Sequence, residues 1–320
     1  MSSELGLPTT NIRRILSPTD LSEASAHATE LSGIVAGWYG AHVTGLFVLS
    51  PLALALPSTM HVAQPTGVSA GDERAEASEL ERLRLETANR FETATRAGVG
   101  LDVLVEVGHP VSRILEWSQR LPADLIVMGT HGSGGFEHAI LGSVAEKVLR
   151  KARCPVLTVA PRARSTSSPP FKRILCALDD SVASRSALDV ALSLSVKARS
   201  SLTLVHVLEW PWEEPPAPRF DELPPAQRDA LAEYRRYREN RASSWLDSLV
   251  PTWLPDSSMV SVRLAHGRPH EQLLRIAADE QSDVIVVGVG RRSALNMALF
   301  GSTAHHLVQA AACPVLTVRG

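Results

Sequence analysis

The strongest constraint on this chain is that its sequence repeats itself. Three pairs of segments share most of their residues: RRILSPTDLSEAS (13–25) with KRILCALDDSVAS (172–184), ADLIVMG (123–129) with SDVIVVG (282–288), and RCPVLTV (153–159) with ACPVLTV (312–318). Each pair is separated by the same offset of 159 residues. One register held across a whole half indicates a tandem duplication, so the chain is expected to fold as two copies of one unit.

The boundary between the copies lies in a segment rich in Pro, Ser and Arg, APRARSTSSPP at 160–170, which is typical of a linker. We expect a first domain over 1–162, a linker over 163–170 and a second domain over 171–320. A chain of 320 residues that is 44% hydrophobic is large enough for two separate cores.

Strand and helix patterns alternate within each copy. In the first half the strand patterns are NIRRILS (11–17), HVTGLFVLS (42–50), LDVLVEV (101–107), DLIVMG (124–129) and PVLTVA (155–160). The helical patterns are 21–38, a charged amphipathic segment at 72–97, 111–121 and 143–152. This alternation predicts an α/β fold with a parallel sheet covered by helices on both faces. Two Pro-rich segments, 51–71 and 209–226, are predicted to be surface insertions or lids.

Composition excludes several classes of partner. The net charge is −2, which gives no reason to expect nucleic acid or an acidic membrane. The three cysteines match no zinc or C-x-x-C spacing, which argues against a disulfide framework and for a reducing compartment. The N-terminus lacks a signal-peptide pattern, and the most apolar run, Gly45 to Leu56, is too short to span a bilayer. We expect a cytoplasmic protein.

The glycine-rich segment GTHGSGGFEHAILGS (129–143) lies between a strand and a helix, at the sheet edge where ligands of such folds bind. A helix N-terminus offers N–H groups and a partial positive charge, both of which suit phosphate. Gly129 and Gly132 would let the backbone approach an anion, while Gly142 and Ser143 would supply N–H and hydroxyl donors. The sequence therefore predicts a phosphate cradle here.

A purely structural interpretation of the same segment stays open. Gly129 could simply end a strand, and Ser143 with Glu146 three residues later fits a capping box that needs no ligand. Two rival phosphate motifs are excluded, because there is no G-x-x-x-x-G-K-[ST] and the first strand-to-helix turn, SPTDLSEAS, contains no glycine.

The spacing G-x2-G-x9-G-[ST], together with PTDLS after the first strand and CPVLTV at the end, resembles the universal stress protein family in its tandem form. The resemblance covers nearly the whole chain. It implies two tandem copies of a doubly wound five-stranded parallel sheet of order 3-2-1-4-5, the adenine nucleotide alpha-hydrolase-like fold. It also implies ATP as the ligand, with adenine and ribose near the end of the first strand and phosphates in the glycine loop.

Carried onto this chain, the resemblance implies ten binding residues in the first copy. They are Pro18, Thr19, Asp20, Val48, Met128, Gly129, Gly132, Gly142, Ser143 and Val144. A carboxylate such as Asp20 can accept hydrogen bonds from ribose or the adenine amino group. The alternative is that Asp20 is a helix N-cap with Glu23 three residues later. Ala145 stands where some ATP-binding relatives carry Ser or Thr, which removes one phosphate donor.

The second copy departs further from the pattern. Its corresponding residues are Asp179, Val207, Gly288, Gly301, Ser302 and Thr303. Arg291 replaces the second glycine and Ala177 replaces the proline. The Arg291 side chain would crowd the phosphate path, bind a phosphate itself or simply be solvated. We expect the second site to be weaker or empty.

Neither a protein-held metal nor catalytic residues are expected. No histidine pair has a zinc-site context. Mg²⁺ would accompany ATP as its counterion, without a carboxylate cluster dedicated to it. An ATP-binding stress or signalling protein is the first functional hypothesis. A nucleotide-independent interaction module is the second, and a slow ATP hydrolase or nucleotidyl transferase is the third. The glycine loop holds no lysine and no arranged base, which argues against an enzyme.

Assembly is predicted from the last strand of each copy. An exposed edge strand favours a pairing partner, so PVLTVA and PVLTVR are expected to pair within the chain as a pseudo-dimer. Whether the chain also forms a homodimer stays open.

Overall fold

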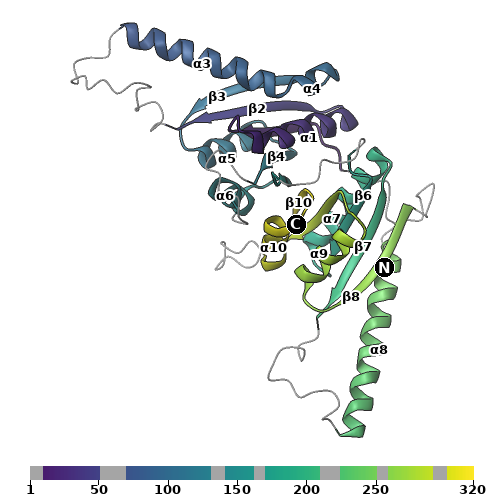
Figure 1. The fold of residues 1–320 in the computed structure, drawn as a ribbon. Coiled ribbons are helices and arrows are strands. Elements are labelled where there is room, and N and C mark those ends of the chain that lie inside the picture. The colour runs from purple at the N-terminus through teal and green to yellow at the C-terminus, as the bar shows by residue number, and fades with distance from the viewer. Residues whose placement is uncertain are drawn as a thin grey trace. The chain divides into compact units, whose positions relative to one another are not determined.

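The computed structural model describes residues 10–50, 70–130, 141–161, 170–209, 224–250, 259–290 and 301–320, with the side chains described from residue 77 onward in the helix that starts at residue 70. The chain divides into two compact units. One covers Asn11–Ser165 and the other covers Thr166–Gly320 together with the first ten residues. Figure 1 labels the elements of each unit.

The first unit alternates strands and helices along the chain. Its elements are β1 (Arg14–Thr19), α1 (Glu23–Tyr39), β2 (His42–Leu49), α3 (Ala70–Arg90), α4 (Glu92–Arg96), β3 (Leu101–Val107), α5 (Pro110–Arg120), β4 (Leu125–Gly129), α6 (Ser143–Lys151) and β5 (Val156–Val159). All five strand patterns and the helical patterns read from the sequence correspond to observed elements.

The second unit repeats this order. Its elements are β6 (Arg173–Leu178), α7 (Val182–Ala198), β7 (Ser201–Leu208), α8 (Pro225–Ser248), β8 (Val260–His266), α9 (Pro269–Asp279), β9 (Val284–Val289), α10 (Ser302–Ala310) and β10 (Val315–Arg319).

The strands of each unit form a parallel sheet with the predicted order. In the first unit the order is β3-β2-β1-β4-β5, and in the second it is β8-β7-β6-β9-β10. β1 pairs with β2 through Ser17 opposite Gly45 and with β4 through Leu16 opposite Ile126. The expected 3-2-1-4-5 order is therefore confirmed.

Helices cover both faces of each sheet. In the first unit α1 and α3 pack on one face, while α5 and α6 form a layer on the other (Figure 1). The central strands are consequently buried on both sides, and the consecutive residues Leu125, Ile126 and Val127 are each at most 2% exposed. This explains why the strands are continuous apolar runs rather than alternating patterns.

The single helix predicted over 72–97 is in fact two helices, α3 and α4, with a break at Phe91. The Phe91 ring is 1% exposed and lies over the β2 backbone, where a Cβ on Gly45 would be 2.5 Å from the ring edge. The break therefore follows from tertiary packing, which a helical pattern does not contain.

The two Pro-rich segments are shorter than expected. Residues 70–71 already belong to α3 and residues 225–226 belong to α8, so the predicted insertions extended too far. Apart from Glu209 and Pro224, the rest of 51–71 and 209–226 lies outside the described residues.

Candidate functional site

The candidate site lies where the strand order of the first sheet reverses. β1 has β2 on one side and β4 on the other, and the helices that follow β1 and β4 cover opposite faces. The carboxyl ends of β1 and β4 therefore border the crevice in which such sheets bind ligands. This edge carries most of the residues implied by the family resemblance: Pro18, Thr19 and Asp20 after or in β1, Val48 in β2, Met128 and Gly129 in β4, and Gly142, Ser143 and Val144 at the start of α6. Gly132 lies outside the described residues.

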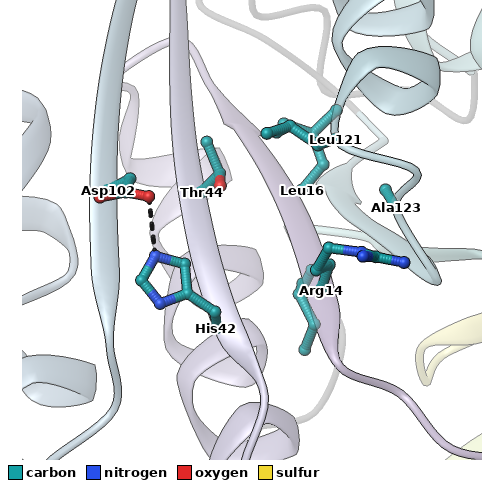
Figure 2. A pocket seen from close by; sticks show the side chains of 8 residues that line it. Arg14, Leu16, His42, Thr44, Asp102, Leu121 and Ala123 are labelled. Carbon is teal, nitrogen blue, oxygen red and sulfur yellow. Dashed lines mark hydrogen bonds and ion pairs between the residues drawn. The ribbon is translucent and has the colours of Figure 1, made fainter.

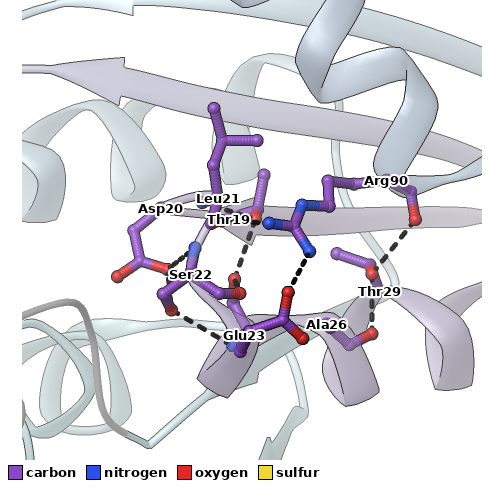
Figure 3. A network of polar contacts seen from close by, with 9 residues as sticks. Thr19, Asp20, Leu21, Ser22, Glu23, Ala26, Thr29 and Arg90 are labelled. Atoms are coloured by element: carbon purple, nitrogen blue, oxygen red, sulfur yellow. Dashed lines mark hydrogen bonds and ion pairs between the residues drawn. The ribbon is translucent and has the colours of Figure 1, made fainter.

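A tight polar turn after β1 holds the Asp20 carboxylate (Figure 3). Asp20 Oδ1 accepts hydrogen bonds from the Ser22 amide at 3.1 Å and from the Ser22 hydroxyl at 2.6 Å. Ser22 is the N-cap of α1, and its Oγ accepts from the Ser25 amide at 3.3 Å. The alternative in which Asp20 caps the helix is therefore wrong, and its carboxylate instead forms an Asx-type turn.

The Thr19 hydroxyl is used inside the same turn. Thr19 is 7% exposed, and its Oγ1 accepts from the Leu21 amide at 3.1 Å and lies 3.0 Å from Ser25 Oγ. These contacts place Thr19 as a support of the turn. The Ser25 hydroxyl donates to the Ser22 carbonyl at 2.9 Å and lies beside Thr19 Oγ1, so it is not directed to the Asp20 carboxylate.

The glycine-rich segment is closed at its base. Thr130 donates its amide to the Val159 carbonyl at 3.0 Å, and Gly142 donates its amide to the Thr130 carbonyl at 2.8 Å. The expectation that the Gly142 N–H is a phosphate donor is therefore corrected, because that group already closes the loop. Residues 131–140 between these two ends lie outside the described residues.

The start of α6 also differs from the capping-box interpretation. Gly142 is the N-cap and Ser143 is the first helical residue, so Ser143 cannot be the capping side chain. Glu146 pairs with Arg150 at 3.2 Å instead. Because the first intrahelical bond runs from the Glu146 amide, the amides of residues 143–145 have no partner within the helix. Ser143 is exposed and carries both an amide and a hydroxyl at this end.

The second unit holds its corresponding carboxylate differently. Asp179 Oδ1 accepts from the Ser181 amide at 3.0 Å and from the Ser184 hydroxyl at 2.6 Å, and Ser184 Oγ also accepts from the Asp179 amide at 2.9 Å. Burial alone would raise the pKa of the Asp179 carboxyl, but the hydrogen bonds from Ser181 and Ser184 and the nearby His206 together hold that pKa below its ordinary value. His206 is itself fixed, with Nδ1 2.8 Å from the Leu178 carbonyl.

A change of one residue explains the different partner. The position of Thr19 is taken by Leu178 in the second unit, 159 residues later. Leu178 has no hydroxyl to engage the helix serine, so Ser184 bonds the aspartate where Ser25 bonds the threonine. The two aspartates thus have corresponding positions in the chain and different surroundings.

The two glycines implied for the second site, Gly288 and Gly301, differ in their surroundings. A Cβ on Gly288 would lie 2.6 Å from the Ala183 carbonyl carbon and from the Ser184 amide nitrogen, so this glycine lets the start of α7 approach the end of β9. Gly301, the N-cap of α10, has open space around the same position. Val207 lies in β7, and Ser302 and Thr303 begin α10. Arg291 lies outside the described residues.

A separate pocket of about 260 Å³ lies at the opposite end of the first sheet, where the strands begin (Figure 2). It lies at the amino ends of β1, β2 and β3. The side chains of Leu16, Leu121 and Ala123 line one part, and His42 lies 2.9 Å from Asp102 at another. These residues lie at the amino ends of the strands, whereas ligands of such sheets bind at the carboxyl ends. The pocket is therefore not part of the candidate site.

Among the described residues, no group of three or more His, Cys, Asp or Glu side chains could hold a metal ion. The histidines of α9 and α10 contact each other instead, with His270 stacked on His306 at a centroid distance of 4.2 Å. No helix in the described part of the chain combines the length and apolar character needed to cross a bilayer.

The sequence and the fold both resemble those of known proteins. The sequence profile of the Universal stress protein family matches residues 11–160 and again residues 170–319. A universal stress protein of Methanocaldococcus jannaschii is 33% identical over 149 residues, which cover 46% of this chain and 81% of that protein. One from Mycobacterium tuberculosis is 27% identical over 211 residues, which are 66% of each chain, so the match spans just under two thirds of that relative.

A solved structure supports the arrangement of the elements. The crystal structure of a universal stress protein from Archaeoglobus fulgidus has a TM-score of 0.64 and 24% sequence identity, over 96% of this chain and 98% of that one. Two family matches that together span nearly the whole sequence, each over one five-stranded unit, establish the assignment. The chain belongs to the universal stress protein family, in its tandem form.

Proposed function

We propose that this protein binds ATP in its first unit and that the nucleotide acts as a regulatory ligand. The proposal rests on two features that lie together where the strand order of the first sheet reverses. These are a turn that presents the Asp20 carboxylate and a helix start whose amides at 143–145 have no intrahelical partner. A carboxylate suits ribose hydroxyls, and a helix N-terminus suits phosphate.

The other residues implied by the family resemblance would form the walls of the nucleotide site. The half-buried Val48 and the buried Met128 offer apolar surface to the adenine, and Pro18 supports the strand end between them. Gly129 and Gly132 leave room for the phosphates, and the amides of Ser143 and Val144 with the Ser143 hydroxyl are their donors. Mg²⁺ would accompany ATP as a counterion, without a carboxylate cluster dedicated to it in the described residues.

The second unit is the weaker site in this proposal. The Asp179 carboxylate accepts from the Ser181 amide and the Ser184 hydroxyl, whereas the Asp20 carboxylate accepts from the amide and hydroxyl of Ser22, so the two carboxylates are held differently. Arg291 stands in the sequence where the first unit has Gly132. The arginine side chain in the phosphate path opposes nucleotide binding by the second unit.

A regulatory role fits this site better than a catalytic one. The segment 129–143 contains no lysine that could reach the terminal phosphates. ATP would act by favouring one conformation of the glycine loop and so changing the surface offered to partner proteins in the cytoplasm. Slow ATP hydrolysis would then be a by-product.

The test is a calorimetric titration of ATP into the nucleotide-free protein and into two exchange variants. Gly132→Arg copies the second loop into the first and should abolish binding. Arg291→Gly performs the reverse exchange and should add or strengthen a second site. An absence of binding in the wild type would favour a nucleotide-independent interaction module. Steady-state turnover of ATP with Mg²⁺ at an ordinary enzymatic rate of about 1 s⁻¹ or more would favour an enzyme.

A further inference from the structure

Arg90, the last residue of α3, reaches the turn that follows β1 (Figure 3). Its Nη2 donates to the Leu21 carbonyl, and its Nη1 lies 3.4 Å from Glu23 Oε1. The main-chain carbonyl of Arg90 lies 3.2 Å from the Thr29 hydroxyl of α1, which it shares as an acceptor with the Ala26 carbonyl at 2.7 Å. Both ends of the residue are therefore fixed, and its side chain is only 27% exposed.

The carbonyl that receives the guanidinium belongs to a residue in an unusual conformation. Leu21 has φ of 63°, in the left-handed region that branched side chains rarely adopt. Leu21 lies between Asp20 and Ser22. Asp179 accepts from the corresponding Ser181 amide without a left-handed residue, so the conformation of Leu21 bears on the bond from the Ser22 hydroxyl to the Asp20 carboxylate. A charge-assisted bond to the Leu21 carbonyl favours this conformation over the ordinary ones.

The second unit provides an internal comparison. The positions of Leu21, Glu23 and Arg90 are occupied there by Asp180, Val182 and Leu249. The residues with positive φ include Leu21 but not Asp180, so the second turn is not left-handed. The second aspartate accepts from the Ser181 amide, as Asp20 does from the Ser22 amide, but the hydroxyl that bonds it belongs to Ser184 of the helix. The arginine, the left-handed residue and the bond from the Ser22 hydroxyl to the aspartate therefore occur together, in the unit with the intact glycine loop.

We propose that Arg90 is a positioning residue for nucleotide binding in the first unit. By holding Leu21 in its left-handed conformation, it sets the Asp20 carboxylate in the orientation that accepts the ribose. This inference rests on the proposed function. It adds a residue outside the glycine loop, the strand ends and the first turn, and it gives a physical reason for the difference between the two units.

The test compares three variants of the full-length chain by ATP titration. Arg90→Met keeps the aliphatic stem and removes the guanidinium, and the dissociation constant for ATP should rise about tenfold or more. Arg82→Met is the matched control, because Arg82 is exposed on the same helix and pairs with Glu79 and Glu86 of that helix. Its affinity should equal that of the wild type.

A second substitution that restores ATP affinity distinguishes a positioning role of Arg90 from a general effect on the packing of α3. Glycine adopts the left-handed region without a steric penalty, so Leu21→Gly in the Arg90→Met background should restore most of the lost affinity. A purely structural defect in α3 packing would not be corrected by a glycine in the turn. Hydrogen exchange without nucleotide gives an independent readout, with faster exchange expected in residues 18–24 of Arg90→Met and unchanged exchange in residues 177–183.

The outcomes are distinct. Wild-type affinity in Arg90→Met overturns the inference while leaving the proposed function intact. Failure of Leu21→Gly to rescue, or unchanged exchange in residues 18–24, also overturns it. A wild type that binds no ATP overturns the proposed function and, with it, the role of Arg90 in nucleotide binding.

Discussion

At the scale of single residues, the aspartates that follow β1 and β6 show how one substitution changes the hydrogen-bond partners of a carboxylate. Thr19 engages the helix serine in the first unit, while Leu178 leaves Ser184 to bond Asp179 in the second. This arrangement gives Asp179 a measurable signature, because its pKa is lower in the folded chain than in the unfolded one. The stabilisation from its ionised form is complete above the unfolded pKa of about 3.9 and is lost as the pH falls through the folded pKa.

Asp179→Asn should therefore lower the free energy of unfolding by about 1 kcal/mol at neutral pH, since it replaces charge-assisted hydrogen bonds with neutral ones. The difference from the wild type should shrink as the pH is lowered from about 5 to about 3. Urea unfolding at several pH values measures it, with the exposed neighbour Asp180→Asn as the control. A difference that stays constant over this range would contradict the assignment.

The sequence identified Asp20 but not the residues that hold it. Ser22 and Ser25 could have been recognised as cap candidates, since serine near a helix start is a standard N-cap. Arg90 could not, because it lies 69 residues from the Leu21 carbonyl that it contacts. The left-handed conformation of Leu21 carries no local sequence signal, since leucine does not favour it.

At the scale of elements, close packing of α1 against α4 depends on one glycine. A Cβ on Gly33 would lie 2.5 Å from the Ala94 Cβ and 3.0 Å from its Cα, whereas a Cβ on Gly37, one turn later, would meet nothing within 4 Å. Gly33→Ala should therefore destabilise the first unit by about 1–3 kcal/mol through overpacking.

Gly37→Ala is the matched substitution in the same helix. It should stabilise the first unit by about 0.5–1 kcal/mol, because alanine is the better helix former at an exposed interior position. Guanidinium unfolding of both variants measures the difference. Equal effects of the two substitutions would show that α1 and α4 are not packed as described.

Elements with a strong periodic pattern were predictable, and their interruptions were not. The five strands of the first unit are apolar runs between polar turns, and each lies within a few residues of its predicted place. The break at Phe91 was missed, since no glycine or proline marks it and its cause is the contact with Gly45. The capping box at Ser143 was also wrong, because the base of the glycine loop places Gly142 at the cap.

At the scale of the whole molecule, the duplication was the most informative signal in the sequence, and it predicted two units of one topology. The pairing of the last strands of the two units, and any homodimer, stay predictions. The two units are also predicted to be functionally unequal. Saturating ATP should protect amides from hydrogen exchange at 18–24 and 142–146, with no comparable protection at 177–183 and 301–305.

This asymmetry has a thermodynamic consequence. A ligand present at about 100 times its dissociation constant stabilises the unit that binds it by about 2.7 kcal/mol. The stabilisation should appear as slower exchange in the core strands β1 and β4 and should be absent from β6 and β9. Equal protection of both sets of strands would mean that both units bind nucleotide or that the units are tightly coupled.

The central claim is that one ATP binds, in the first unit, through Asp20. The most direct measurement is calorimetric titration of ATP into the nucleotide-free wild type, Asp20→Asn and Asp179→Asn, three chains that differ at corresponding positions of the duplicated sequence. The account predicts about one site per wild-type chain, at least about tenfold weaker binding by Asp20→Asn, and unchanged binding by Asp179→Asn. Two equal sites in the wild type, or Asp20→Asn binding as tightly as the wild type, would contradict it.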